Sequence, residues 1–347
     1  MIICCEINYI KMLNKFLKNK SILITGGTGS FGKAFVKNLL KKSIKLKKII
    51  IFSRDELKQF EMSNELNIVK NSNLRFFLGD VRDKERLHRA LEGVDYVIHA
   101  AALKQVSASE YNPIETIKTN VLGAQNIIEA SIDSGVKKVI SLSTDKAVSP
   151  VNLYGATKLC AEKLFVSANN IVGKKKTIFS CVRYGNVIGS RGSVIPIFID
   201  QVKQKHFTIT DTRMTRFVLT LNEGVELVLW TLLNSIGSEI VIPRIPSVKI
   251  IDIAKAIDPK LKLKKIGVRL GEKLHEDLIT EAESLNTLGI QDKYILLPVV
   301  EKKYINYYKK FSKEVKKHNK FSYSSNINKN FLNVQQIKRI LKKENFI

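Results

Sequence analysis

The sequence has few of the features that mark secreted, membrane or metal-binding proteins. Its four cysteines, at positions 4, 5, 160 and 181, fit no metal-site spacing, so we expect reduced thiols in a cytoplasmic protein. No run of about 18 apolar residues occurs, which argues against a membrane-spanning helix. No internal repeat or low-complexity linker interrupts the 347 residues, a length that suits one large domain and a smaller one. The sequence therefore predicts a globular protein without metal or membrane.

Acidic residues are also scarce, at 32 against 58 basic residues, which gives a net charge of +26. Such an excess would permit binding to nucleic acid or to an anionic membrane. The lysines, however, are scattered through every expected helix, without interleaved aromatic residues and without a recognised nucleic-acid motif. Solvated helix faces explain this charge better, and we expect no nucleic-acid partner.

Residues 1–20 precede the first recognisable strand. The opening Met-Ile-Ile-Cys-Cys is apolar but too short for a signal peptide, and it lacks a basic region and a small-residue cleavage site. A second methionine stands at position 12. We expect residues 1–20 to be a disordered extension or the result of an over-long start assignment, with Met1 or Met12 as the true start.

A glycine-rich turn follows the strand expected at residues 21–25. Glycines at three-residue spacing let the chain turn from strand to helix and let backbone N–H groups approach a pyrophosphate at the helix start. An amphipathic run to residue 40 supplies that helix. This context predicts a dinucleotide site made by Gly26, Thr28, Gly29, Ser30, Phe31 and Gly32.

The next strand, expected at residues 48–52, ends in Ser-Arg-Asp. Position 53 lies 21 residues beyond Gly32, where an NAD enzyme usually places a carboxylate on the ribose. A hydroxyl followed by a guanidinium suits a 2′-phosphate instead, so the sequence favours NADP over NAD. The acidic residue at position 55 weakens this inference slightly, and the lysine at 58 supports it. The expected contacts are Ser53, Arg54, Asp55, Glu56, Leu57 and Lys58.

Strand and helix signals alternate over some 160 residues. Further strands are expected at 74–78, 95–99, 137–142 and 178–183, and a long helix at 112–133. Regular alternation predicts an α/β fold with a doubly wound parallel Rossmann sheet, whose catalytic groups belong at the carboxyl ends of the strands. Additional cofactor contacts are expected at Asp80, Val81, Ala101, Ala102, Thr119 and Val187.

Residues 143–158 carry the most chemistry. An Asp145–Lys146 couple follows a strand end, and Tyr154 and Lys158 stand four residues apart, on one face of a helix. An ammonium beside a phenol favours the phenolate, which is a base suited to oxidising an alcohol next to a nicotinamide. A Tyr-x-x-x-Lys match is weak alone, but the glycine-rich turn upstream supports the interpretation.

Together these motifs resemble the extended short-chain dehydrogenases/reductases, and more closely the inverting UDP-N-acetylglucosamine 4,6-dehydratases of pseudaminic acid biosynthesis. The resemblance covers nearly the whole chain, at residues 25–32, 52–58, 79–83, 99–105, 143–158, 183–196, 209–217, 267–276 and 323–326. It implies an NADP-binding Rossmann domain at residues 21–185 and a mainly substrate-binding domain at residues 186–347. Within the second range, the residues at about 210–236 are expected to belong to the Rossmann domain again. It also implies a homo-oligomer.

In this interpretation Tyr154, poised by Lys158, deprotonates the C4 hydroxyl of the sugar while hydride leaves C4, and Thr144 belongs to the same catalytic group. Lys146 then removes the C5 proton, and Asp145 protonates the departing C6 hydroxyl. Retaining dehydratases typically carry Asp-Glu where this chain has Asp-Lys, and by resemblance that change accompanies inversion at C5. The implied product is UDP-2-acetamido-2,6-dideoxy-β-L-arabino-hex-4-ulose. The division of roles among Asp145, Lys146 and Tyr154 is less firmly implied than their presence in the site.

Substrate contacts are implied at four matching positions, Lys104, Asn186, Arg269 and Glu272, the last two at the UDP moiety. Arg191 and Arg216 could serve at the diphosphate as well, or act as structural ion-pair partners.

Three alternatives stay open at this point. One is the capsule-type inverting dehydratase of the N-acetyl-L-fucosamine route, whose members often lack the tyrosine present here at position 154. Another is a nucleotide-sugar 4-epimerase, which would not need Lys146 as a C5 base. The third is a non-catalytic NADP-sensing or RNA-binding protein, which would have no use for Tyr154, Lys158, Asp145 and Lys146.

Overall fold

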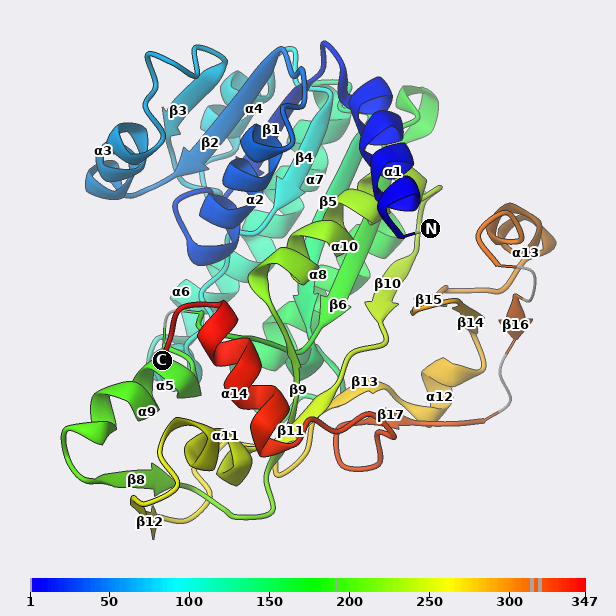
Figure 1. Ribbon diagram of the computed structural model, residues 1–347. Coiled ribbons are helices and arrows are strands. Elements are labelled where there is room, and N and C mark those ends of the chain that lie inside the picture. Colours follow the sequence, from blue (N-terminus) through cyan, green and yellow to red (C-terminus); the bar gives the residue numbers. More distant parts are fainter. Residues whose placement is uncertain (1, 191, 313–314, 318–319) are drawn as a thin grey trace.

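A ten-stranded sheet forms the centre of the molecule (Figure 1). The computed structural model describes residues 2–190, 192–312, 315–317 and 320–347. Seven neighbouring strands run parallel in the order β3-β2-β1-β4-β5-β6-β10, and three antiparallel strands extend the β10 edge in the order β15-β14-β16. The parallel strands are β1 Ser21–Thr25, β2 Lys48–Ser53, β3 Leu74–Leu78, β4 Tyr96–His99, β5 Lys138–Thr144, β6 Ile178–Tyr184 and β10 Ile240–Pro243, and the antiparallel ones are β14 Thr287–Ile290, β15 Lys293–Leu296 and β16 Lys316–Lys317.

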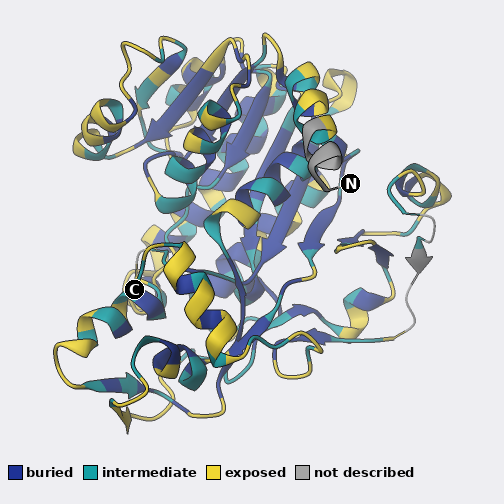
Figure 2. Cartoon of the chain, viewed as in Figure 1, coloured by how far each residue is buried: buried dark blue, intermediate teal, exposed yellow. Residues whose placement is uncertain are grey.

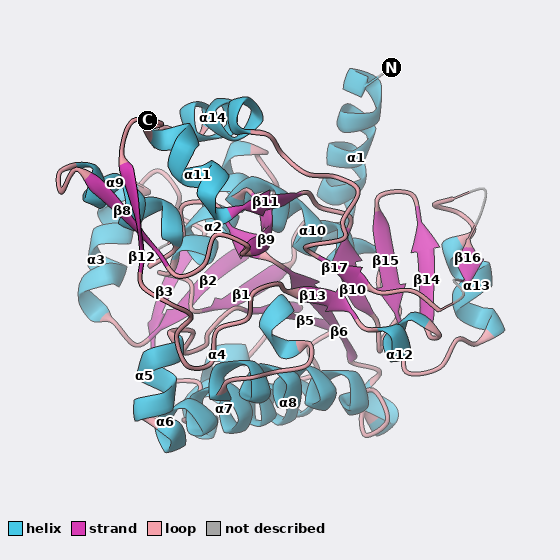
Figure 3. Cartoon of the chain, turned by 90° about the horizontal axis from the view of Figure 1, so that it is seen from below, coloured by secondary structure: helices cyan, strands magenta, loops and turns pink. Residues whose placement is uncertain are grey.

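Helices cover both faces of this sheet (Figure 3). The helices α2 Ser30–Lys41 and α10 Leu221–Asn234 pack together on one face, and α4 Lys84–Leu91, α7 Gly123–Asp133 and α8 Leu153–Ala168 lie on the other. Because helices enclose the sheet on both faces, β1 is buried along its whole length (Figure 2). Strands enclosed in this way are rich in apolar residues. The α/β prediction with a doubly wound parallel sheet is confirmed.

The strand order reverses at β1: β2 pairs with one edge of β1 and β4 with the other, so the strands that follow extend the sheet in opposite directions. In an open parallel sheet, ligands bind at this switch point, outside the carboxyl ends of the strands. The helix expected over 112–133 is interrupted: α6 Pro113–Ile117 runs into a π-helical turn, Lys118–Leu122, before α7 begins. Around the sheet lie α3 Glu56–Glu65, α5 Val106–Tyr111, α12 Glu281–Ser284, α13 Lys302–Tyr308 and the 3₁₀ turns Asp145–Ala147 and Gly173–Lys175.

The N-terminal segment differs from the expectation of disorder. Residues Ile2–Leu17 form the helix α1, and the side chains of Leu13 and Leu17 are fully buried in the main core. Phe16 stacks on Tyr96 of β4 with ring centroids 5.0 Å apart. This helix is therefore corrected from an extension to a packed element, and burial of these three apolar side chains supplies its stability.

A second, smaller hydrophobic cluster holds the part of the chain below the sheet in Figure 1. Helices α11 and α14 pack against each other there, and Phe198 of α9 lies against Phe207 of β8. This part includes β7 Asn186–Val187, α9 Val194–Val202, β8 His206–Ile209, β9 Thr215–Leu219, β11 Ser247–Lys249, α11 Ile250–Ile257, β12 Lys262–Lys265, β13 Asp277–Ile279, β17 Tyr323–Ser324 and α14 Val334–Lys343. From the sequence, only about 210–236 of this later part of the chain is expected to belong to the first domain. The strands β10, β14, β15 and β16, which lie outside that range, also belong to the large sheet.

Candidate active site

A cavity of about 1260 Å³ lies between the carboxyl edge of the sheet and the smaller part. One drug-sized ligand usually occupies a pocket of about 300–1,000 Å³. This cavity is therefore large enough for a dinucleotide and a second ligand together. Its walls come from the glycine-rich turn, the ends of β2, β4 and β5, the helix α8 and the loop at residues 267–273.

The glycine-rich turn forms one end of the cavity, as the sequence predicts. All six of its predicted residues, Gly26, Thr28, Gly29, Ser30, Phe31 and Gly32, line the wall. A Cβ atom on Gly32 would come within 2.3 Å of the carbonyl oxygen of Gly27, so only glycine lets α2 begin this close to the turn. The first N–H groups of α2 have no partners within the helix, and they make this end attractive to a phosphate.

The carboxyl end of β2 carries the residues expected to bind an adenosine ribose. Ser53 is buried and its Oγ accepts a hydrogen bond from Gln59 Nε2 (3.0 Å). The guanidinium of Arg54 is half exposed and lies 3.5 Å from Asp80 Oδ2. Asp55 caps α3 by accepting from Lys58 N (3.0 Å), and its carboxylate also pairs with Lys58 Nζ. The Asp55 carboxylate is therefore already paired with groups of its own helix, the N–H and the ammonium of Lys58.

Two residues predicted for this end do not reach it. Ser53, Arg54, Asp55, Lys58, Asp80 and Val81 all line the cavity, but Glu56 and Leu57 do not. Both belong to the first turn of α3, and the Leu57 side chain is 63% exposed. A helix turns successive side chains through about 100°, so neighbours of a cavity-lining residue face elsewhere.

The middle of the cavity is walled by Ala101, Ala102, Thr119, Lys158 and Val187, all of them predicted contacts. Sequence reasoning missed the residue that holds this wall in place. Asn120, in the π-helical turn, accepts from Leu103 N (2.8 Å) and donates to Leu103 O (2.9 Å) and to Thr157 Oγ1 on α8 (3.0 Å). It thereby fixes the segment leading to Lys104 against the helix that carries Tyr154.

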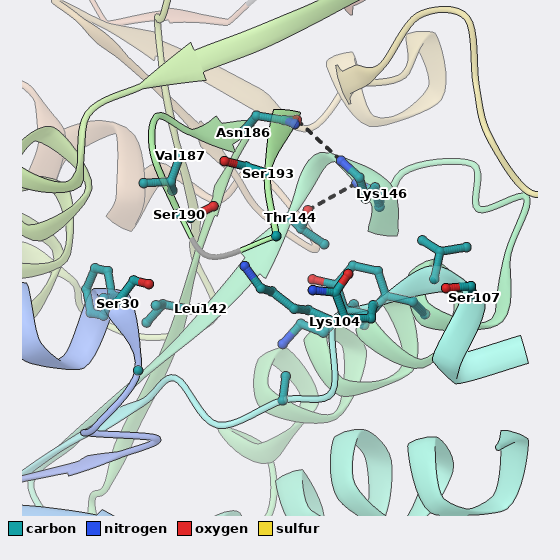
Figure 4. Close-up of a pocket in the computed structure, with 18 of the residues that line it drawn as sticks. Ser30, Lys104, Ser107, Leu142, Thr144, Lys146, Asn186, Val187, Ser190 and Ser193 are labelled. Atoms are coloured by element: carbon teal, nitrogen blue, oxygen red, sulfur yellow. Dashed lines mark hydrogen bonds between the residues drawn. The ribbon is translucent and has the colours of Figure 1, made fainter. Parts of the chain in front are cut away.

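The predicted catalytic residues meet at the end of β5. Lys146 Nζ donates to Asp145 Oδ1 (3.0 Å), and Thr144 Oγ1 donates to the same oxygen (3.0 Å). Lys146 Nζ also donates to Asn186 Oδ1 (3.4 Å) (Figure 4). Helix α8 approaches this turn closely because residue 155 is glycine: a Cβ there would lie 2.2 Å from the Lys146 carbonyl oxygen. The close approach brings Tyr154 and Lys158 to the cavity wall beside Lys146.

Asp145 is the exception within this group. Its side chain is completely buried and does not line the cavity, whereas Thr144 and Lys146 do. Asp145 therefore reaches a bound molecule only through the two residues with which it shares hydrogen bonds.

A buried carboxylate absent from the sequence prediction completes the site. Glu276 Oε1 lies 3.5 Å from Lys146 Nζ and 3.8 Å from Arg216 Nε, and Glu276 Oε2 lies 3.9 Å from Lys273 Nζ. Arg216 donates to the carbonyls of residues 215, 273 and 274, which ties it to the fold as well as to Glu276. Glu276 comes from a loop 130 residues beyond Lys146, and no local pattern marks it.

The charged and polar groups of the site alter one another's proton affinity. Burial raises the pKa of Tyr154 to about 12, while the Lys146 ammonium and a hydrogen bond with Thr144 oppose that rise. Burial lowers the pKa of Lys158 below its usual value. Among the charged groups, Lys146 is thus a cation that counters the burial of Tyr154. Burial alone would lower the pKa of Lys146, but Asp145 and Glu276 outweigh it and hold that pKa above its usual value.

The four predicted substrate contacts all line the cavity. Figure 4 shows Lys104, Lys146 and Asn186 around the same space. Burial, reinforced by the nearby Lys146 charge, lowers the pKa of Lys104. Arg269 N donates to Glu272 Oε2 (3.3 Å), which closes the loop that carries both. Arg191 lies outside the described residues.

Two further findings concern metal binding and membrane spans in the described part of the chain. Within the described residues, no three or more His, Cys, Asp or Glu side chains gather as a metal site would require. None of the described helices combines the length and the apolar character needed to cross a membrane.

The sequence pattern of the polysaccharide biosynthesis protein family matches residues 22–298, about four-fifths of the chain. The chain belongs to this family. Within it, the motifs are those of the extended short-chain dehydrogenases/reductases.

Several curated members of the family are close in sequence. A Campylobacter jejuni protein of serotype O:23/36, named UDP-N-acetylglucosamine 4,6-dehydratase (inverting), is 58% identical over 285 residues, covering 81% of this chain and 84% of that protein. A protein of the same name from C. jejuni serotype O:2 is 54% identical over 325 residues, covering 91% and 94%. A Rickettsia conorii protein named UDP-glucose 4-epimerase is 43% identical over 330 residues, covering 93% and 95%.

Solved structures show the same architecture. The X-ray structure of Pen from Bacillus thuringiensis superimposes with a TM-score of 0.87 at 37% identity, covering 96% of this chain and all of that one. The dTDP-glucose 4,6-dehydratase DesIV from Streptomyces venezuelae, solved with NAD bound, gives a TM-score of 0.65 at 21% identity, covering 73% of this chain and 86% of that one. The second likeness shows the fold alone.

Proposed function

We propose that this chain is an NADP-dependent UDP-N-acetylglucosamine 4,6-dehydratase, a lyase that inverts the sugar at C5. The observation that carries the proposal is the placement of Lys146 in the cavity wall, between Asp145, Asn186 and Glu276 and beside Tyr154. The two Campylobacter relatives named as inverting dehydratases support it, at 54% and 58% identity.

The first step is oxidation at C4, for which a bound nicotinamide supplies the hydride acceptor and, later, the hydride returned to C6. Tyr154 removes the proton of the C4 hydroxyl. With its pKa raised to about 12, Tyr154 needs a cation to form a phenolate; the Lys146 charge lowers that pKa, and Lys158 lines the same cavity. A ketone at C4 then makes the C5 proton acidic.

Elimination follows at C5 and C6. Lys146 removes the C5 proton and leaves the electron pair on the conjugated C4 carbonyl as an enolate. The C6 hydroxyl departs as water when the Thr144 hydroxyl, which lines the cavity, gives it a proton and takes the proton of Asp145 in exchange. Asp145 therefore enters this step as the neutral acid and leaves it as a carboxylate. Delivery through Thr144 replaces the direct transfer from Asp145 that the sequence suggests.

The remaining residues hold the two ligands at opposite ends of the cavity. We assign the 2′-phosphate of NADP to Arg54 and the neighbouring Ser53, and the pyrophosphate to the start of α2. Arg269 and Glu272 are assigned to the UDP moiety of the substrate, and Lys104 and Asn186 to the sugar. The resemblance alone supports a cytoplasmic homo-oligomer.

By the same resemblance, the reaction would be the first step toward pseudaminic acid, for flagellin glycosylation or for another surface polysaccharide. The capsule-type dehydratase of the N-acetyl-L-fucosamine route would share the chemistry. Tyr154, which members of that group often lack, favours the pseudaminic acid type.

A nucleotide-sugar 4-epimerase is the second candidate, because the Rickettsia relatives carry such a name. An epimerase oxidises and reduces C4 only and has no step for a base at C5. The buried network around Lys146 favours the dehydratase.

Incubation of the purified protein with UDP-N-acetylglucosamine and NADP⁺ tests the proposal directly. We expect a 4-keto-6-deoxy product, detectable by NMR, and no net reduction of the cofactor. Conversion to UDP-N-acetylgalactosamine instead would support the epimerase. Absence of both products would reject a role in either reaction.

A further inference from the structure

Glu276 is a buried carboxylate that faces three cations and accepts no hydrogen bond through its side chain from any described residue. Only 3% of its side chain is exposed, yet it belongs to the cavity wall. No donor within the described part of the chain reaches its buried Oε2 atom. Buried polar atoms are rarely left without a partner in folded proteins, so an exception in a cavity wall calls for an explanation.

The fold, and not the carboxylate's own bonds, directs Glu276 toward Lys146. The backbone N–H of Glu276 donates to Ser325 Oγ (2.9 Å), and Ser325 N donates back to the Glu276 carbonyl (2.8 Å). Ser325 Oγ also shares a hydrogen bond with Thr215 Oγ1 (2.8 Å), beside Arg216. The segment of Ser325, itself held by Thr215, therefore fixes the backbone of Glu276 without using its carboxylate.

Lys146 needs such a proton acceptor. A lysine can remove the C5 proton only as a neutral amine, but the two carboxylates of Asp145 and Glu276 stabilise its ammonium. Asp145 is poorly placed to relieve it, because its Oδ1 already accepts hydrogen bonds from Thr144 and Lys146. Its Oδ2 has no donor among the described residues either, but Asp145 is fully buried and does not line the cavity, whereas Glu276 does. Glu276, which lines the cavity and accepts no hydrogen bond, has room for the proton.

We propose that Glu276 is a positioning residue that takes the proton of the Lys146 ammonium and so converts Lys146 into the C5 base. In this step one N–H bond of Lys146 breaks and an O–H bond forms on Glu276, and both charges disappear. The neutral amine then forms a bond to the C5 proton, and the C5–H electron pair moves to the C4 carbonyl. The inference rests on the proposed dehydratase function.

The electrostatics of Glu276 agree with this role. Burial raises the pKa of Glu276 above its usual value. The Lys146, Arg216 and Lys273 charges oppose that rise, and Asp145 reinforces it. Glu276 consequently binds a proton more readily than an exposed glutamate does. Entry of a sugar nucleotide would expel water from the cavity and favour the uncharged Lys146–Glu276 pair further.

The variants Glu276→Gln and Glu276→Asp separate proton transfer from packing. The first keeps the shape but cannot take the proton, and the second keeps the carboxylate. Two steps are followed in each: C4 oxidation, seen as transient near-ultraviolet absorbance of reduced nicotinamide in a single turnover, and exchange of the C5 hydrogen with D₂O. We expect Glu276→Gln to slow C5 exchange by about a hundred-fold or more while C4 oxidation stays within a few-fold of wild type. Glu276→Asp should keep more C5 exchange than Glu276→Gln.

Glu281→Gln is the matched control, because Glu281 is an exposed carboxylate five residues away that pairs with Lys320. It should behave as wild type. Equal loss of both steps in Glu276→Gln would mean that Glu276 only maintains the site, and unchanged C5 exchange would mean that Lys146 needs no acceptor. Either result overturns the proposal. A wild-type protein that forms no 4-keto product would reject the dehydratase function itself, and the Glu276 proposal with it.

Lys273→Met gives an independent test that does not remove the carboxylate. Loss of this cation raises the proton affinity of Glu276, so the acid limb of the C5-exchange profile under saturating substrate should move to higher pH. Lys320→Met, which removes an exposed lysine, is its control. An acid limb that stays in place in Lys273→Met would contradict proton uptake by Glu276.

Discussion

The two ends of the cavity hold their charges in different ways. At the adenosine end, the side chains of Arg54 and Lys58 are 49% and 42% exposed, and each pairs with a neighbouring aspartate at the surface. At the sugar end, the Lys146 side chain is 25% exposed, and its partners Asp145 and Glu276 are almost wholly buried. Exposed pairs contribute about 0–1 kcal/mol, whereas breaking a buried pair costs about 3–5 kcal/mol.

The difference separates binding from chemistry. Arg54 can exchange its weak surface partner for a ligand phosphate at little cost, which suits a cofactor that must be recognised and held. Water screens the charges around Lys146 less than it screens the exposed pairs, so each one alters the proton affinity of the next more strongly. We therefore expect substitutions at the adenosine end to change affinity and those at the sugar end to change turnover.

The largest effect is expected from Lys146→Ala. Loss of a general base lowers the rate by about 10²–10⁴-fold, so dehydration should fall by that factor while NADP⁺ binding stays near wild type. Product formation by NMR and cofactor titration by fluorescence check the two parts. Undiminished 4-keto product from Lys146→Ala would show that Lys146 is not an essential base.

A buried ion pair away from the cavity tests whether burial alone makes a charge costly. Arg183 on β6 is fully buried and bonds both Glu162 on α8 and Glu283, which caps α12. Arg183→Met leaves Glu162 buried without its cation and should destabilise the protein by about 3–5 kcal/mol. Urea unfolding measures this loss. Arg89→Met, at an exposed pair with Glu92, should cost less than about 1 kcal/mol; similar losses in the two variants would remove the contrast between buried and exposed charge.

Arg54→Ala should have the smallest effect, and only on affinity. Loss of a charge-assisted contact to the 2′-phosphate is worth about 1.5–3 kcal/mol, or roughly ten- to a hundred-fold in the Kd for NADP⁺. The Kd for NAD⁺, which has no 2′-phosphate, should change little. Calorimetric titration of both cofactors decides the matter, and equal weakening would indicate that Arg54 merely supports the loop.

Much of this fold could be predicted because its signals are local. The parallel strands are short apolar runs, and the glycine-rich turn, the Asp145–Lys146 couple and Tyr154 each stand in a contiguous motif. It is harder to predict which side chains of a helix face the cavity. Glu56 and Leu57 follow Arg54 closely in the sequence, but they do not line the cavity. The helix α1 escaped prediction because its stability comes from burying Leu13 and Leu17 against the sheet.

The sugar end shows the limit of local signals most clearly. Glu276 reaches Lys146 only because β13 and β17 pair and place its loop beside β5. Arg216 comes from β9 and Lys273 from the same loop as Glu276, and neither spacing nor periodicity relates them to Asp145. Residue types indicate what a catalytic turn can do, but the charges that tune it are assembled by the tertiary fold.

Turnover of UDP-N-acetylglucosamine in D₂O tests the central claim most directly. If a protein base removes the C5 proton and an exchanged acid returns one from the opposite face, the product should carry deuterium at C5. The hydrogen gained at C6 should be protium from C4, because the hydride is held within the enzyme between oxidation and reduction. NMR of the product reads both positions. Protium retained at C5, or deuterium entering C6 during initial turnover, would contradict the mechanism.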